Sequence, residues 1–262
     1  MISAGIDVGS LTAKCAILKD SKLLAYKIIR VTPNLEETAE RVFTEALELA
    51  GLEREDIEAI VATGYGRSKV KFAERTITEI TCHAKGALFF IPTARTVIDI
   101  GGQDSKVISI GDKGNVIEFA MNDKCAAGTG RFLEVMANAL NVKLEELGDL
   151  AVRAERVVKI SSTCTVFAES EVISHITRGE KIENIVAGIH EAIASRIAAL
   201  ARRVKIKEDV VLTGGVAKNI GGKNALEKNL GYKIKVPTEP QIVGAVGAAK
   251  IAAERKIKSP YS

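Results

Sequence analysis

The chain has 262 residues, of which 47% are hydrophobic and 27% charged, with a formal net charge of +4. This small excess of Lys and Arg argues against binding to nucleic acid or an anionic membrane, and the absence of Trp argues against platforms for stacking bases. No apolar run approaches the roughly 20 residues that span a bilayer, and the first residues lack a basic leader, so we expect a cytoplasmic protein.

Along the first third of the sequence, alternating apolar residues predict strands and longer periodic runs predict helices. Asn34 stands where a helix N-cap is expected, with acidic residues in the turn that follows, and Pro92 ends the second helical pattern. Strands are expected at 2–10, 13–20, 22–31 and 57–64, and helices at 34–52 and 76–91.

The remaining two thirds continue the alternation of strands and helices. We expect two strands and a turn within 96–110, a strand at 115–122, two helical patterns, a strand at 156–161 (RVVKIS), a long helix at 181–204, a strand running into a Gly turn and a helix at 209–219, and a helix at 241–256. Strands that alternate with helices predict an α/β fold with partly parallel sheets.

One internal repeat has the period of a domain. IDVGSLTAKCAI begins at Ile6 and IDIGGQDSKVIS at Ile98, and the same offset of 92 residues relates their Asp, Gly and Lys residues. We interpret the repeat as an ancient duplication. It predicts two related domains, 1–93 plus 240–262 and 94–239, with a hinge near Pro92 and a C-terminal helix that returns to the first domain.

Both copies of the repeat have the residues of a phosphate-binding turn. In the first, Asp7 ends a buried strand, and the backbone N–H groups that follow it are suited to phosphate oxygens. Asp7 is suited to hold Mg²⁺ through water. A plain hairpin, tied by the Asp side chain, is the structural alternative. The remaining nucleotide-binding candidates in this turn are Gly9, Ser10, Leu11, Thr12 and Lys14.

In the second copy, Asp99 is the expected ligand of Mg²⁺ through water, and Gln103 or Asp104 orients the attacking water; a hairpin is again the alternative. A third Gly turn, VVLTGGVAKN, lets a nucleoside lie against the backbone, although no Walker A or Rossmann pattern is present. The other candidates in these two turns are Gly101, Gly102, Gly214, Gly215, Val216 and Asn219.

Two cysteines stand just ahead of helical patterns, Cys125 in KCAAGTGRFLEVMANAL and Cys164 in SSTCTVFAESEVISHI, with helices expected to begin near Gly128 and Thr165. Two thiolates are too few for a four-iron cluster, but two from each of two identical chains suffice. Helix N-termini, with about +0.5 charge, favour such thiolates. Structural thiols are the alternative, and that is our expectation for Cys15 and Cys82. The three histidines (His83, His175 and His190) show no metal-site spacing.

The paired turns and VLTGG resemble the actin/sugar kinase/Hsp70 ATPase superfamily, whose α/β fold has duplicated ribonuclease H-like domains and an interdomain nucleotide cleft. Within it, NDKCAAGTGRF and ISSTCTVFAESEV closely resemble the ATP-dependent activators of 2-hydroxyacyl-CoA dehydratases. These activators belong to the BadF/BadG/BcrA/BcrD ATPase family, with the ATPase subunits of benzoyl-CoA reductases. The resemblance covers essentially the whole chain.

The resemblance implies a homodimer that binds ATP or ADP with Mg²⁺ and one 4Fe-4S cluster, whose ligands are Cys125 and Cys164 of each chain. It implies an ATPase that passes one electron from a ferredoxin or flavodoxin to an iron–sulfur dehydratase or reductase. Three alternatives stay open: the reductase component for a benzoyl-CoA reductase-like or double-cubane-cluster protein, a small-molecule kinase of the same fold, and a redox sensor. The acyl-CoA substrate is not encoded here, because that chemistry would occur on another protein.

Overall fold

The computed structural model describes residues 1–256, which divide into two compact units. Unit 1 comprises Met1–Ala94, Ile110–Ile117 and the described residues from Pro237 on; unit 2 comprises Arg95–Ser109 and Glu118–Val236. Each unit is built on one five-stranded mixed sheet. Among the described residues, no helix combines the length and apolar character needed to cross a bilayer.

The sheet of unit 1 has the strand order β3-β2-β1-β4-β5, with β4 parallel to β1 and both β2 and β3 in antiparallel pairing. Its strands are β1 (Ile2–Val8), β2 (Thr12–Lys19), β3 (Lys22–Arg30), β4 (Ala59–Thr63) and β5 (Arg75–Thr76). Its helices are α1 (Leu35–Ala50), α2 (Glu79–Phe90) and α8 (Val243–Lys256). The Asn34 side chain accepts a hydrogen bond from Glu37 N, which confirms the predicted cap of α1.

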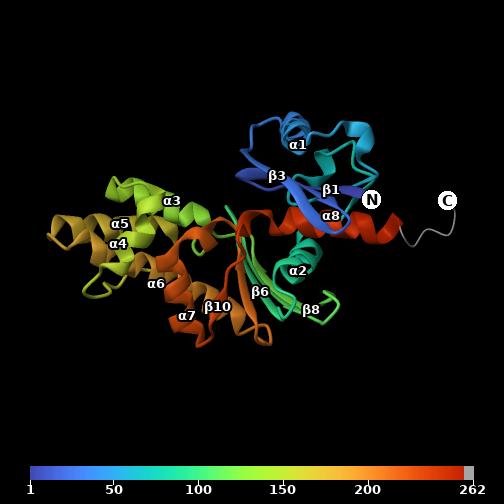
Figure 1. Cartoon of the computed structure of the whole chain (residues 1–262). Helices are drawn as coiled ribbons and strands as arrows, with labels where there is room; N and C mark the ends of the chain where they lie inside the picture. Colours follow the sequence, from blue (N-terminus) through green and yellow to red (C-terminus); the bar gives the residue numbers. More distant parts are fainter. Residues whose placement is uncertain (257–262) are drawn as a thin grey trace. The chain divides into compact units, whose positions relative to one another are not determined.

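Helices α1 and α8 cover opposite faces of this sheet (Figure 1). Side chains alternate along β1, so that Ile6 packs toward α1 while Gly5 lies against α8. The backbones of α2 and α8 also approach closely, since a Cβ at Gly86 would overlap Val243 O and one at Gly247 would overlap Cys82 O. Small residues therefore let α8 lie directly on its neighbours' backbone.

The sheet of unit 2 has the order β10-β9-β6-β7-β8, and its large core lies between one sheet face and several helices. The strands are β6 (Thr96–Ile100), β7 (Ser105–Ile110), β8 (Val116–Asn122), β9 (Val210–Thr213) and β10 (Ile234–Lys235). The helices are α3 (Gly130–Leu140), α4 (Leu147–Val152), α5 (Thr165–Thr177), α6 (Ile182–Ala201) and α7 (Ile220–Leu230).

The two sheets share one topology. Beside β1 lie antiparallel β2 and parallel β4, and beside β6 lie antiparallel β7 and parallel β9; each sheet then ends in one more parallel strand, β5 or β10. The repeat seen in the sequence is thus a repeat of five strands in the same order. In the second copy, the helices α3 to α6 are inserted between β8 and β9.

One sequence-based prediction was wrong. The segment 156–161 is extended but forms no strand, because side chains and a helix, instead of a neighbouring strand, satisfy its backbone. The Asn184 side chain accepts from Arg156 N, Asn184 O accepts from Val158 N, and Glu171 accepts from Ser161 N. The helix expected near Gly128 is present and begins two residues later, at Gly130, since Gly128 has a left-handed φ of +90° that a helix excludes.

Candidate nucleotide-binding turns and cysteine loops

The first turn lies at the carboxyl end of β1. Asp7 and Lys14 are paired residues of β1 and β2, and Lys14 Nζ lies 3.4 Å from Asp7 Oδ2. The turn closes with a 3.1 Å hydrogen bond from Gly9 N to Thr12 O, and Ser10 and Leu11 lie at its tip. Unit 1 therefore brings all its predicted nucleotide-binding residues together around one shielded ion pair.

Sequence reasoning missed a second element of this site, the Thr63–Gly64 end of β4. Thr63 is the parallel partner of Asp7, and Gly64 has a φ of +87°. A Cβ at Gly64 would overlap Asp7 Oδ1 and Val8 O. Only glycine lets this turn lie so close to the carboxylate. The sequence signal was the Thr-Gly pair directly after a buried strand, which recurs at Thr213.

The second turn repeats this geometry at the end of β6. Lys106 is the β7 partner of Asp99, and its Nζ lies 3.3 Å from Asp99 Oδ2 and 2.7 Å from Asp104 Oδ2. The turn closes from Gly101 N to Asp104 O at 2.9 Å, and Gln103 is exposed at its tip. Lys106, which is only 3% exposed, thus holds two carboxylates, a role that the sequence analysis did not assign to it.

The third turn follows β9 and packs on the second. Thr213 Oγ1 donates to Asp99 Oδ1 at 2.8 Å. Gly214 has a φ of +85°, and its missing Cβ would lie 3.0 Å from Asp99 Oδ1. The structure therefore brings Asp99 and Gly214 together. Of the other predicted residues, Gly215 and Val216 lie in a short 3-10 helix and Asn219 caps α7 by accepting from Gly222 N.

The four cysteines are all free and fall into two classes. Cys15 and Cys82 are buried in unit 1, where burial raises the pKa of the Cys15 thiol and raises that of Cys82 to about 12, as suits the predicted core thiols. Cys125 and Cys164 are only partly buried, and both belong to unit 2.

The loops that hold Cys125 and Cys164 lie side by side. Cys125 Sγ is 3.8 Å from Thr163 O, the carbonyl just before Cys164. Cys164 is the N-cap residue of α5, with an extended backbone, so its side chain stands at the positive end of a helix of 13 residues. Asn122 Nδ2 donates to Cys125 O at 2.8 Å and to Ala127 O at 3.3 Å, which fixes the other loop.

The second turn is also bonded to the helix that follows the Cys125 loop. Gly130 N donates to Gly101 O and Arg131 N donates to Gly102 O, both at 2.8 Å. These are the first N–H groups of α3, which have no partner inside their own helix. Within unit 2, two backbone hydrogen bonds therefore connect the second turn to the end of the Cys125 loop.

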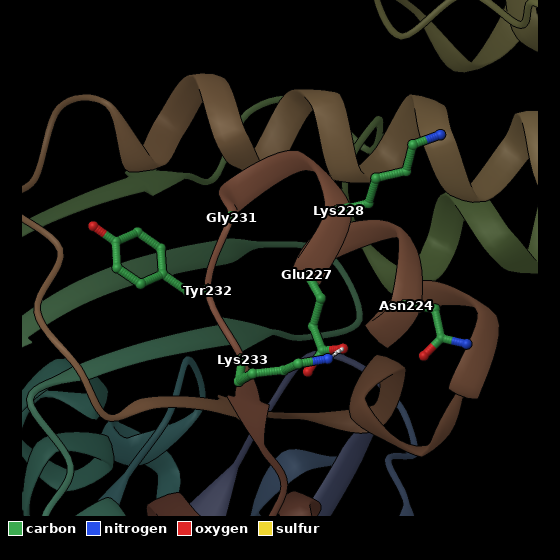
Figure 2. A pocket seen from close by; sticks show the side chains of 6 residues that line it. All are labelled: Asn224, Glu227, Lys228, Gly231, Tyr232 and Lys233. Carbon is green, nitrogen blue, oxygen red and sulfur yellow. Dashed lines mark ion pairs between the residues drawn. The ribbon is translucent and has the colours of Figure 1, made fainter.

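Metal-ligating side chains are not clustered within the described part of the chain. Across residues 1–256, no group of three or more His, Cys, Asp and Glu side chains is arranged to hold a metal ion. A surface hollow of about 400 Å³ lies between the end of α7 and β10, and none of the predicted site residues lines it (Figure 2). Its lining includes Glu227 and Lys233, which pair with each other.

A family model matches residues 4–252, described as the BadF/BadG/BcrA/BcrD ATPase family. The chain belongs to this family. One relative is the activator of lactoyl-CoA dehydratase from Anaerotignum propionicum, 51% identical over 97% of this chain and 98% of the relative. The crystal structure of Acidaminococcus fermentans (R)-2-hydroxyglutaryl-CoA dehydratase component A matches with a TM-score of 0.95 and 49% identity, over 98% of this chain and 100% of that one.

A second solved structure of high similarity has a nucleotide analogue. It is the activator of the 2-hydroxyisocaproyl-CoA dehydratase from Clostridium difficile with bound ADPNP, with a TM-score of 0.92 and 45% identity over both complete chains. One of the benzoyl-CoA reductase subunits of Thauera aromatica is 35% identical over 98% of this chain and 95% of that one. The predicted family membership is therefore confirmed.

More distant structures share only the fold. A ROK family glucokinase from Streptomyces griseus matches with a TM-score of 0.62 at 13% identity, over 97% of this chain and 100% of the kinase. Together with the two sheets of identical strand order, this match confirms the predicted α/β class of the sugar kinase and Hsp70 type.

Proposed function

We propose that this protein is an ATP-hydrolysing activator that delivers a low-potential electron to a partner iron–sulfur enzyme such as a 2-hydroxyacyl-CoA dehydratase. The observation that carries the proposal is the pairing, in unit 2, of two partly exposed cysteine loops with an Asp–Lys turn bonded to the helix beyond one of them. Relatives of 51% and 50% identity are named as dehydratase activators, which supports this class of partner.

The nucleotide role is assigned to the three turns. Backbone N–H groups at the tips of the first two turns are to bind phosphate oxygens, and Gly214 and Gly215 leave room for the nucleoside. Each Asp is already paired with a lysine, at 3.4 Å for Asp7 and 3.3 Å for Asp99, so both carboxylates suit a magnesium ion held through water better than direct ligation.

For the attacking water we favour Gln103 over Asp104. The carboxylate of Asp104 lies 2.7 Å from Lys106 Nζ, and this ion pair fixes its orientation toward the lysine. Gln103 is exposed at the tip of the turn, and its amide offers both a donor and an acceptor. We therefore assign Gln103 to orient the water and Asp104 to hold Lys106 in place.

The donor set of the cysteine loops fits a 4Fe-4S cluster shared by two chains. Each chain offers two free, partly exposed thiols in adjacent loops, and a cubane cluster takes four thiolates. When bound, the cluster supplies a site that accepts and passes on one electron. Cys125 and Cys164 would hold it, the N-terminus of α5 would favour its negative charge, and a homodimer would complete the set.

Nucleotide binding is coupled to the cysteine loops through α3. When the second turn closes on phosphate, the carbonyls of Gly101 and Gly102 move with it, and the N–H groups of Gly130 and Arg131 follow. The Cys125 loop ends at that point and is displaced. Hydrogen bonding and solvent exposure are levers on the potential of a bound cluster, and this displacement would change both around the Cys125 loop that would hold it. Free energy for the change comes from the difference in ATP affinity between the two conformations.

The electron donor we propose is a ferredoxin or flavodoxin in the cytoplasm, where thiols stay reduced. The acceptor is a dehydratase. A second candidate acceptor is a benzoyl-CoA reductase-like or double-cubane-cluster enzyme, which the 35% identity to the Thauera aromatica benzoyl-CoA reductase chain supports.

The test is anaerobic reconstitution with iron and sulfide, followed by ATP-dependent reduction of a purified dehydratase. We expect a dimer with about four iron per two chains, and loss of that iron in Cys125→Ala and Cys164→Ala. The matched control, Cys82→Ala, removes a buried thiol and should keep the iron. A monomer without iron contradicts the proposal, and ATP turnover stimulated by a sugar and unaffected by Cys125→Ala indicates a kinase instead.

A further inference from the structure

Arg196 projects from α6 toward both cysteine loops. Its neighbours Ile193 and Ile197 are buried in the core of unit 2, which fixes this part of the helix. Arg196 itself is half-buried, and its Nη1 donates to Ser162 O at 3.3 Å. Ser162 is two residues before Cys164. The guanidinium therefore holds the backbone of one cysteine loop.

The aliphatic stem of the same side chain packs on the other loop. A Cβ at Gly128 would lie 3.0 Å from Arg196 Cγ, which is tighter than ordinary van der Waals contact, and 3.5 Å from Arg196 Cβ. Gly128 also has a φ of +90°, which other residues rarely adopt. Glycine, three residues after Cys125, is thus what lets the Arg196 stem lie against this loop.

The charge of Arg196 has no carboxylate to neutralise it. Among residues 1–256, no Asp or Glu lies within ion-pairing distance of its guanidinium, whereas Arg131 and Arg156 each pair with a glutamate. A half-buried cation without an acidic partner, in contact with both loops that hold the thiols, is available to offset negative charge on thiolates. This adds an electrostatic role to the mechanical one.

We propose that Arg196 is a positioning residue that holds the Cys125 and Cys164 loops of one chain in register for a common ligand and offsets the charge of their thiolates. The proposal deepens the proposed function and rests on it for the identity of the ligand. The relative position of the two loops does not depend on a bound cluster, so this part of the proposal is tested on protein without iron.

The experiment measures how readily one reagent bridges the two thiols. Protein without iron is treated with dibromobimane, which crosslinks neighbouring thiols, and the Cys125–Cys164 product is quantified by mass spectrometry. Arg196→Met keeps most of the aliphatic part of the side chain and removes the positive charge and the N–H donors. Arg196→Lys keeps the positive charge but replaces the planar guanidinium by an ammonium group. Arg202→Met, at the exposed end of α6, is the matched control.

We expect crosslinking to be about tenfold slower in Arg196→Met than in the parent, intermediate in Arg196→Lys and unchanged in Arg202→Met. Iodoacetamide reacts with one thiol at a time, so its rate measures the reactivity of each cysteine by itself. The crosslinking rate is divided by this alkylation rate. After reconstitution, Arg196→Met should also lose iron to a chelator about tenfold faster.

Crosslinking of Arg196→Met at the parent rate overturns the proposal, even if the chain binds iron. If the parent binds no iron but Arg196→Met still slows crosslinking, the positioning role stands and the proposed function fails. If thermal unfolding shows that Arg196→Met does not fold, the crosslinking rate of Arg196→Lys decides. A rate equal to that of the parent overturns the role of the Arg196 guanidinium in positioning the loops.

Discussion

The two Asp–Lys turns have the same geometry but are hydrogen-bonded to different neighbours. In both, an Asp pairs across the hairpin with a Lys, and a Gly with φ near +86° packs on the carboxylate from the adjacent parallel strand. The first turn is bonded to its own sheet, since Val31 N donates to Leu11 O at 3.0 Å. The second turn's carbonyl groups accept from the start of α3.

This difference bears on the coupling proposed above. The first turn is hydrogen-bonded to its own sheet, whereas the second turn is hydrogen-bonded to the helix that follows the Cys125 loop. The extra carboxylate of Asp104 on Lys106 adds a further hold in the second turn. The helices between β8 and β9 thus connect the second copy to the cysteine loops.

The largest expected effect comes from removing each copy's carboxylate charge. We expect Asp7→Asn and Asp99→Asn each to lower the rate of ATP hydrolysis by about 10²- to 10³-fold, since each removes an electrostatic group from the site while keeping its shape. Steady-state phosphate release measures this, with the exposed Asp149→Asn on α4 as control. If only one of the two variants is impaired, the turns are not equal in binding.

A buried histidine makes unit 2 sensitive to acid. Burial lowers the pKa of His190, which is 1% exposed, to about 4. Because the unfolded chain binds the proton at pH 6.5 and below, stability from neutral His190 is complete above pH 6.5 and is lost as the pH falls toward 4. We expect about 2 kcal/mol less stability at pH 5 than at pH 7 from this group.

Urea unfolding at the two pH values measures the effect, and His190→Gln should flatten the dependence. His190 lies close to Gly221 and Gly222 at the start of α7. The loss of stability at low pH should therefore appear first in unit 2, and spectroscopic probes placed in that unit would detect it. An unchanged pH dependence in His190→Gln would falsify the assignment.

A smaller effect should follow from loosening the bond between the second turn and α3. A Cβ at Gly130 would lie 3.1 Å from Gly101 O, so Gly130→Ala pushes the turn away from the helix. In the parent we expect ADPNP to change the alkylation rate of Cys125 about tenfold, and in Gly130→Ala by less than about twofold. Cys164, alkylated in the same sample, is the internal control. An equal response in both proteins would contradict coupling through α3.

Much of the fold could be predicted because its signals are local. The offset of 92 residues between Asp7 and Asp99 correctly placed two equivalent hairpins, and the alternation along β1 follows from residues next to each other. The segment 156–161 has the same kind of apolar pattern and was wrongly predicted as a strand. Its partners, Asn184 and Glu171, lie on helices that sequence alone does not place beside it.

The sequence predicted the carboxylates, glycines and cysteines of the candidate site, but not the contacts that link them to residues distant in the chain. Thr63–Gly64 was missed because a Thr-Gly pair after a strand is a weak signal by itself. Its equivalence to Thr213–Gly214 follows from the strand pairing, which places Thr63 beside Asp7 and Thr213 beside Asp99. Arg196 carries no motif; its importance lies in reaching two loops that are 34 residues apart in the chain, at Gly128 and Ser162. Long-range packing of this kind leaves no local pattern.

Helix α8 follows unit 2 in the sequence, although it packs on the first strand of unit 1. During synthesis, about 140 residues separate Ala94 from the segment that contains α8, which takes roughly 7 to 30 s at usual rates. Throughout that time the face of β1 around Gly5 lacks the helix that covers it. The sheet of unit 1 therefore receives its full cover only after unit 2 has been synthesised.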